Sequence, residues 1–199
     1  MRAETIADFL DQLAARLPTP GGGATAALDA AQAAALVAMV ARYSQGPDLE
    51  RIVAQADELR RDALALADAD AEAFGAVATA YALPRGSQEE KQARSAAIAV
   101  GLAGAARPPA DVIRTALLVT ELAEDLLPAA NRNVITDVGA AAAAARAAVV
   151  TSQLNIEVNL RGIADAEVRA ELTATAAMAT QIAERADQIV TAVRQELSR

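Results

Sequence analysis

Alanine is the feature of this sequence that most restricts its fold. It occupies 56 of the 199 positions, whereas aromatic residues make up only 2% of the chain. Alanine is the strongest helix former, but its side chain buries little apolar surface. No stretch shows the alternating, β-branched and aromatic pattern of a strand. The sequence therefore predicts an all-α bundle whose helices pack closely together.

Prolines, glycines and capping residues divide the chain into about six mostly long helices. Ser87 and Glu90 form a capping box at the start of the fourth helix, and Pro108 and Pro109 kink or split it. There are no linkers or repeats, so we expect a single domain over residues 1–199. The expected helices span residues 4–17, 24–44, 49–81, 88–128, 137–160 and 165–199.

Apolar spacing predicts which helix faces meet the core. The side chains expected there are Ile6, Phe9, Leu10 and Leu13 in the first helix and Ile52, Leu59, Leu66 and Phe74 in the third. Asp48 stands where the third helix would take its N-cap.

The residue inventory narrows the chemistry that the chain can perform. It has no Cys and no His, so thiolate nucleophiles, imidazole bases and nearly all zinc sites are excluded. Proton transfer must use carboxylates, Lys, hydroxyls or water, and we expect no metal and no cofactor. The net charge is −8, which argues against a nucleic-acid partner. Only one lysine, Lys91, is present.

Location and assembly follow from the same composition. The N-terminal sequence MRAETIADFL lacks the apolar stretch of a signal peptide, and the longest strictly apolar run, Ala33–Ala41, is nine residues. We therefore expect a cytoplasmic protein with no membrane span. A core this poor in large side chains would gain burial from a second subunit. We expect a homodimer formed through alanine-rich helix faces, with Gly139–Ala148 as a candidate surface.

The stretch PTPGGGATAAL, at Pro18–Leu28, brings bare backbone to the start of the second helix. Three consecutive glycines, Gly21, Gly22 and Gly23, precede a strong helix former, although glycine weakens a helix. Unpaired N–H groups and the helix dipole make such an end suitable for an anionic group. A tight helix entry or a close helix crossing explains the glycines as well. The stretch is not a P-loop, because it lacks the lysine.

Two carboxylates are candidate acid–base groups. Asp70 and Phe74, in the stretch DADAEAF, are four residues apart and share a helix face. If Phe74 points inward, Asp70 is drawn toward the core and its pKa rises, as a general acid or base requires; otherwise the stretch is a solvated face. Asp137 stands at the start of the fifth helix, where a cap is the alternative role.

Asn155 and Asn159 lie four residues apart on an otherwise apolar helix. Two amides on one face can hydrogen-bond a polar heterocycle, or they can bond a neighbouring helix. Either role is compatible with the sequence.

Several segments together resemble the cyclodeaminase/cyclohydrolase family. They are PTPGGGATAALDAAQAAALVAMVAR, DADAEAFGAVATAYALPRG, EEKQARSAAI, ITDVGAAAAAARAA and NIEVNL, in the family's order and spacing over about residues 3–185. The family includes the cyclodeaminase half of formiminotransferase-cyclodeaminase and stand-alone methenyltetrahydrofolate cyclohydrolases. The chain departs from the family pattern at Ala24, usually a serine, at Arg85, and at Arg107–Pro109, and it lacks lysines after the second helix.

The resemblance implies an all-α, usually homodimeric enzyme of folate one-carbon metabolism. By position, Pro20 with Gly21–Gly23, Phe74, Asn155 and Asn159 would bind the folate, and Asp70 and Asp137 would be catalytic. Either the glutamyl carboxylates or the pterin of the folate would approach the bare backbone. A formiminotransferase is then a functional partner to expect.

Three functions remain open on the sequence. We expect formimidoyltetrahydrofolate cyclodeaminase first, in which N10 of the substrate displaces ammonia to give 5,10-methenyltetrahydrofolate. Methenyltetrahydrofolate cyclohydrolase, which adds water to the same carbon, is the alternative. A catalytically silent, folate-binding or structural paralogue is the third, because of Ala24 and the missing lysines.

Overall fold

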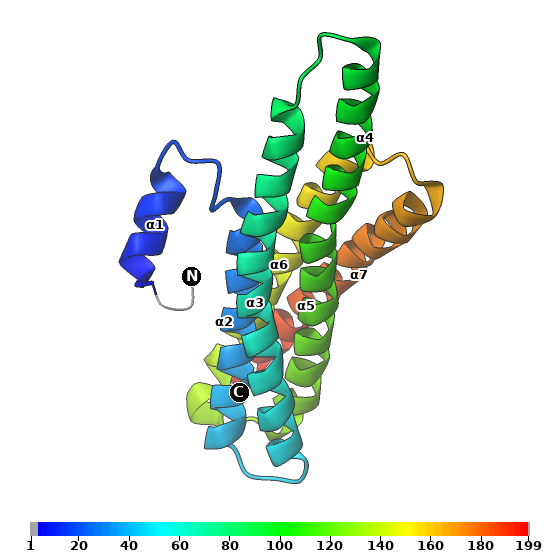
Figure 1. Cartoon of the computed structure of the whole chain (residues 1–199). Helices are drawn as coiled ribbons and strands as arrows, with labels where there is room; N and C mark the ends of the chain where they lie inside the picture. The colour runs from blue at the N-terminus through cyan, green and yellow to red at the C-terminus, as the bar shows by residue number, and fades with distance from the viewer. Residues whose placement is uncertain (1–3, 199) are drawn as a thin grey trace.

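The computed structural model describes residues 4–198, which form a bundle of long α-helices (Figure 1). That part of the chain contains no strand, and the all-α prediction is confirmed. The helices are α1 (Ile6–Ala14), α2 (Gly22–Tyr43), α3 (Leu49–Ala82), α4 (Gln88–Ala105), α5 (Arg107–Leu126), α6 (Ile135–Leu160) and α7 (Ala166–Leu197), with 3₁₀ turns at η1 (Leu127–Ala129) and η2 (Arg132–Val134).

Helix α2 lies at the centre of the bundle and packs against α3, α5 and α6. Most of its buried residues are alanines, from Ala24 to Ala41. Small side chains allow helix backbones to approach closely. The close contacts between neighbouring helices then supply stabilisation that large apolar side chains would otherwise give this core. The position of α2 also fixes the place of its glycine-rich start, between α3 and α6.

Most helices begin and end near the prolines, glycines and capping residues that were predicted to bound them. The Ser87–Glu90 capping box is present, with Glu90 N donating to Ser87 Oγ at 3.2 Å and Ser87 N donating to Glu90 Oε2 at 3.0 Å. The two prolines split the fourth predicted helix at Ala106, since they fit the first turn of α5 but cannot continue α4. Asp48 is the N-cap residue of α3, as predicted, although its backbone is left-handed (φ 63°) and its side chain forms no capping hydrogen bond.

Helix α1 differs most from the prediction. It starts at an unpredicted capping box between Thr5 and Asp8 and ends at Ala14, before the expected end. Figure 1 shows it standing apart from the bundle. Phe9 is buried, but Ile6 and Leu10 are 80% and 53% exposed, so the predicted core face is wrong for these two side chains. The stripe lines a cavity between α1 and α2, so that Ile6 and Leu10 stay exposed while Phe9 is buried.

The predicted core of α3 is correct at its beginning and wrong near its end. Ile52 is buried, and Leu59 and Leu66 pack half-buried against the core. Phe74, however, is 45% exposed. The α3–α4 hairpin extends beyond the other helices (Figure 1), so this turn of α3 has fewer neighbours to cover it.

Two helices begin earlier than expected. Helix α2 starts at Gly22, with Gly21 as an extended N-cap residue. Helix α6 starts at Ile135, so Asp137 lies in its first turn. The alternative that Asp137 caps this helix is wrong, because the N-cap position is Val134 and no side chain caps it.

Three helical segments have the length and mean hydropathy of a membrane span: Gly22–Tyr43, Gln88–Ala129 and Arg132–Leu160. The length of the longest strictly apolar run, nine residues, did not reveal these segments. Alanine-rich helices reach this mean hydropathy without long runs of that kind. Most of the α2 segment is buried inside the bundle. Length and composition alone therefore do not distinguish a packed alanine-rich helix from a membrane helix here.

Candidate active site

A cavity of about 160 Å³ lies at the N-terminal end of α2, between α3, α6 and the end of α4. It brings together residues that are far apart in the sequence, including most of those predicted for the site. The residues that line it are Pro18, Thr19, Gly21, Gly22, Gly23, Asp70, Phe74, Val77, Ala105, Asn155, Val158 and Asn159.

Gly23 is required because the Asp70 carboxylate occupies the space of a side chain. A Cβ built on Gly23 would overlap the carboxylate oxygens and carbon of Asp70. The N–H of the next residue, Ala24, donates a hydrogen bond to the same carboxylate. The glycine-rich start of α2 therefore approaches the Asp70 side chain of the same protein chain. This contact is one reason for the absence of a side chain at position 23. The N–H donation also satisfies a free donor of the helix terminus.

Burial raises the pKa of Asp70, and the hydrogen bond from Ala24 offsets part of this effect. The carboxylate loses water because it lies against the backbone of Gly23, at the wall of the cavity. The sequence attributed this desolvation to Phe74, but Phe74 is too exposed to supply it alone. A carboxyl group with a raised pKa changes protonation closer to neutral pH, as a general acid or base must.

Asn155 and Asn159 present hydrogen-bond acceptors to the cavity. Each Nδ2 donates to the carbonyl one turn earlier on α6, to Thr151 at 2.8 Å and to Asn155 at 2.9 Å. These bonds fix the orientation of both amides, because a carbonyl accepts only from the nitrogen. The Oδ1 atoms are left as acceptors. The cavity therefore offers the acceptor oxygens of Asp70, Asn155 and Asn159 together with the second N–H of each amide and the hydroxyl of Thr19.

An apolar rim surrounds the polar groups. Phe74 and Val77 come from α3, Ala105 from the end of α4, and Val158 from α6. Val158 is 72% exposed and Phe74 45% exposed, so the rim faces solvent and can receive a flat ring. The sequence could have placed the two valines at the site from helical spacing, because Val77 follows Phe74, and Val158 follows Asn155, by three residues. Pro18, Thr19 and Ala105 gave no such signal.

Two predicted residues lie outside this cavity. Pro20 is in the connection to α2 but is not among the lining residues. Asp137 is on the same helix as Asn155 but eighteen positions earlier, which is about 27 Å along the helix axis. Within one chain, Asp70 and Asp137 therefore do not meet at a common site. No cluster of His, Cys, Asp and Glu among residues 4–198 has the arrangement of a metal site.

The closed bundle, with a carboxylate beside a glycine-rich helix start, defines an all-α protein with a candidate acid–base site. A profile described as formiminotransferase-cyclodeaminase matches residues 5–178. The chain belongs to this family, and it is an enzyme of the cyclodeaminase and cyclohydrolase type.

Relatives and solved structures agree with this assignment. The chain is 41% identical over 170 residues to a methenyltetrahydrofolate cyclohydrolase of Methylorubrum extorquens, covering 81% of this chain and 82% of that protein. It is 29% identical over 169 residues to the mouse formimidoyltransferase-cyclodeaminase and 30% over 194 residues to the chicken protein. These two matches cover 81% and 90% of this chain, but only about a third of each of the longer proteins.

A solved structure shares the whole fold. The crystal structure of formiminotetrahydrofolate cyclodeaminase from Thermotoga maritima superimposes with a TM-score of 0.85. The two sequences are 30% identical, and the match covers 100% of this chain and 99% of the other.

Proposed function

We propose that this protein is a methenyltetrahydrofolate cyclohydrolase, which adds water to 5,10-methenyltetrahydrofolate and gives 10-formyltetrahydrofolate. The observation that carries the proposal is the 41% identity to a protein of that name over most of both chains. The sequence alone put the cyclodeaminase reaction first. The comparisons favour the cyclohydrolase reaction over the cyclodeaminase reaction, and both reactions belong to the same class of folate one-carbon enzymes.

Asp70 is the proposed acid–base group. As a carboxylate it takes a proton from the water that attacks the methenyl carbon. The bond between that carbon and N5 then breaks, and the protonated Asp70 delivers a proton to N5. The added hydroxyl loses its own proton as it becomes the formyl carbonyl, so the cationic substrate gives a neutral product and one proton is released overall. A pKa raised by burial suits a group that must both accept and donate a proton.

The pterin ring is the part of the folate that we place beside the glycines. Its amino group and ring N–H atoms are donors, and the side chains of Asp70, Asn155 and Asn159 offer acceptors. The glutamyl end, which carries only negative charge, would meet the Asp70 carboxylate there. Of the two orientations that the sequence left open, hydrogen-bond complementarity supports this one.

Cyclodeamination is the second candidate, because the Thermotoga maritima protein of the same fold is named for it. There N10 attacks the formimidoyl carbon, and the leaving nitrogen takes a proton and departs as ammonia. Both reactions need proton transfer at one carbon and an oriented ring, so the same residues serve either.

Methenyl absorbance distinguishes these functions in one assay. The purified protein is mixed separately with 5,10-methenyltetrahydrofolate and with 5-formimidoyltetrahydrofolate. Loss of absorbance above the spontaneous rate supports the cyclohydrolase, and its appearance from the second substrate supports the cyclodeaminase. If the absorbance changes with neither substrate, the protein is the catalytically silent, folate-binding paralogue.

We also propose a homodimeric, cytoplasmic protein that acts without metal or cofactor. No nucleic-acid or membrane partner is proposed. A formiminotransferase would be the functional partner if the cyclodeaminase reaction is the correct one.

A further inference from the structure

A cavity of about 590 Å³ lies between α1 and the bundle, and it shares no lining residue with the candidate active site. Small-molecule pockets have volumes of roughly 300–1,000 Å³, so this one is of suitable size. Its walls are the apolar face of α1, the first turns of α2 and one turn of α3. The lining residues are Glu4, Thr5, Ile6, Phe9, Leu10, Leu13, Thr25, Leu28, Asp29, Gln32, Arg61 and Leu64.

Apolar side chains make up half of this lining, and several of them face water. Ile6 and Leu10 on α1 are largely exposed. Leu28 on α2 and Leu64 on α3 are half-buried and pack against the core. A ligand that removes such apolar area from water gains binding free energy. The cavity therefore suits a ligand with an apolar body.

Asp29 places a carboxylate among these apolar side chains. It is half-buried, and within residues 4–198 it accepts no hydrogen bond and forms no ion pair. Burial raises the pKa of Asp29, and no neighbouring charge or donor among those residues opposes this effect. A cation placed beside the carboxylate would compensate for the water that it has lost.

Two polar neighbours of Asp29 on α2 also favour a ligand that donates hydrogen bonds. Thr25 and Gln32 lie four residues before it and three after it, on the same face of the helix. Thr25 Oγ1 uses its proton on the Gly21 carbonyl at 3.0 Å, so its oxygen can only accept from a ligand. Gln32 Nε2 donates to the Leu28 carbonyl at 3.3 Å, which leaves Oε1 as an acceptor beside the second N–H. An ammonium group, with three donors and no acceptor, matches these atoms.

The charge of the whole lining is also favourable to a cation. Glu4 and Asp29 are acidic, and Arg61 is the basic residue of the lining. Arg61 is exposed and already has an interaction of its own. Asp29 is therefore left as the charged group that a ligand can pair with.

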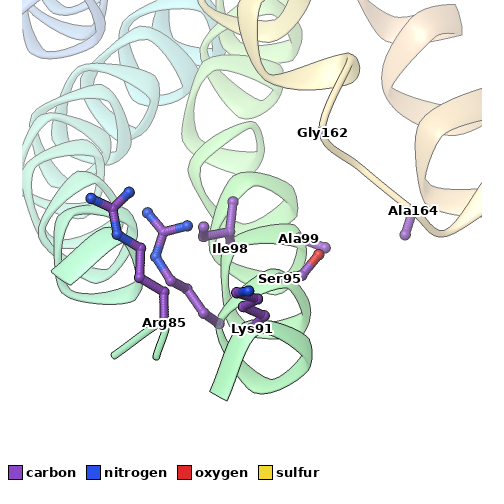
Figure 2. Close-up of a pocket in the computed structure, with 8 residues that line it drawn as sticks. Arg85, Lys91, Ser95, Ile98, Ala99, Gly162 and Ala164 are labelled. Carbon is purple, nitrogen blue, oxygen red and sulfur yellow. The ribbon is translucent and has the colours of Figure 1, made fainter. Parts of the chain in front are cut away.

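Two other cavities suit an organic cation less. Figure 2 shows Arg85 and Lys91 at a cavity of about 400 Å³ near the α3–α4 connection, whose lining contains no acidic residue and would repel a cation. In the candidate active site, the Asp70 carboxylate already accepts the N–H of Ala24. Of these three places, the cavity at Asp29 is the one that offers an unshared carboxylate.

We propose that the cavity between α1, α2 and α3 binds an organic cation, whose ammonium group pairs with Asp29 and whose apolar body packs against Ile6 and Leu10. The ligand class is a primary or secondary amine on an aromatic or branched alkyl group. This site is independent of the proposed function, because no residue of the candidate active site lines it. Since α1 forms one wall, a bound amine also holds α1 against the bundle.

Binding of 2-(1-naphthyl)ethylamine to the full-length protein tests the site, with the naphthyl fluorescence as the signal. The chain has no tryptophan, so its own emission interferes little. 2-(1-Naphthyl)ethanol has the same apolar body without the charge. We expect the amine to bind at least about tenfold more tightly than the alcohol, because only the amine makes a charged hydrogen bond.

Three variants separate the charge from the apolar contact. Asp29→Asn keeps the size of the side chain, and it should remove the preference for the amine while binding of the alcohol stays the same. Asp11→Asn removes the same charge at an exposed position of α1 outside the lining, and as the control it should bind both compounds as the unmodified protein does. Ile6→Ser removes apolar area at an exposed position and should weaken both compounds alike.

Hydrogen exchange of α1 provides the second readout. The amine should slow exchange of the α1 amides in the unmodified protein and in Asp11→Asn, but much less in Asp29→Asn. Exchange in α1 that is unchanged when the amine is bound would contradict the proposed place of binding.

Three further results would overturn the site. The first is equal affinity for amine and alcohol, or a preference that Asp29→Asn retains. The second is amine binding that is lost in Asp70→Asn and kept in Asp29→Asn, which would mean that the compound enters the candidate active site. The third is the absence of saturable binding. If Ile6→Ser then has a lower mass in light scattering than the unmodified protein, a second copy of the chain covers this surface instead.

Discussion

Asp70 is subject to two opposing influences at the level of single residues. Burial against Gly23 disfavours its charge, and the N–H of Ala24 favours it, with burial the larger effect. A carboxylate that also fills the space of a missing side chain has a structural role as well as a chemical one. The candidate site therefore links the shape of the helix start to the protonation of the group proposed for catalysis.

Asp70→Asn tests the chemical role. The amide keeps the shape of the side chain but cannot exchange protons, so we expect the protein to fold and bind folate while turnover falls about 10²–10⁴-fold. Asp137→Asn is the matched control, as Asp137 lies outside the cavity, and it should retain most of its activity. Full activity of Asp70→Asn would exclude Asp70 as the acid–base group.

The raised pKa of Asp70 also predicts how stability depends on pH. A carboxyl group whose pKa is higher in the folded than in the unfolded protein stabilises the fold while it is protonated. That contribution is complete below the unfolded-state pKa and is lost as the pH rises through the folded-state pKa. Denaturant unfolding of the unmodified protein and Asp70→Asn should therefore show a difference that grows in favour of the variant over this range. A difference independent of pH would contradict it.

Gly23→Ala tests the steric role. Its Cβ would overlap the Asp70 carboxylate, so one of the two must move, at a cost of about 1–3 kcal/mol in the free energy of unfolding. Gly22→Ala is the control, because its Cβ would meet Asn155 and Thr151 at ordinary distances of 3.4 Å or more. In a double-mutant cycle, Asp70→Ala should remove most of the cost of Gly23→Ala. Additive effects would argue against the contact.

At the level of elements, most helices could be predicted from the sequence, because their ends depend on local residues. Ser87 with Glu90 caps α4, and the prolines break the chain before α5. The faces of α1 could not be predicted, since Phe9 and Leu10 belong to one apolar stripe and only packing selects between them. The cavity likewise depends on α2, α3 and α6 meeting, which the sequence pattern alone does not give.

The weak attachment of α1 leads to a prediction about local stability. A cavity of about 590 Å³ lies between α1, α2 and α3, and Phe9 is the buried side chain of α1. A nine-residue helix is not stable alone. Phe9→Ala should therefore expose the amides of α1 to rapid hydrogen exchange while α2 to α7 remain protected. Leu10→Ala, at a 53% exposed position, should change little, and equal loss of protection throughout the bundle would contradict this.

At the level of the whole molecule, α6 carries an apolar row on its outer side. The exposed residues are Ala143, Ala147, Val150, Leu154 and Val158, spaced as one stripe of a helix. The predicted Gly139–Ala148 surface is partly used inside the chain, as Ala141, Ala142, Ala145 and Ala148 are buried. An antiparallel pair of α6 helices centred between Val150 and Thr151 would place Ala147 opposite the partner's Leu154, small against large.

The predicted homodimer is tested at this row. Leu154→Glu would place a charge in the middle of the interface, so light scattering should give a dimer for the unmodified protein and a monomer for the variant. Val100→Glu, at a 74% exposed position of α4, is the control and should remain dimeric. A monomeric mass for the unmodified protein at micromolar concentration would rule out the prediction.

The contact between Gly23 and Asp70 also limits how this protein can change over evolutionary time. A larger residue at position 23 must displace Asp70, and a shorter one at position 70 leaves a gap and an unpaired Ala24 N–H. Each single step lowers fitness if the site is needed, even where the two changes together would be tolerated. Such a pair is inherited as a unit, so a lineage that loses the activity would be expected to lose both residues, in either order, within a short interval.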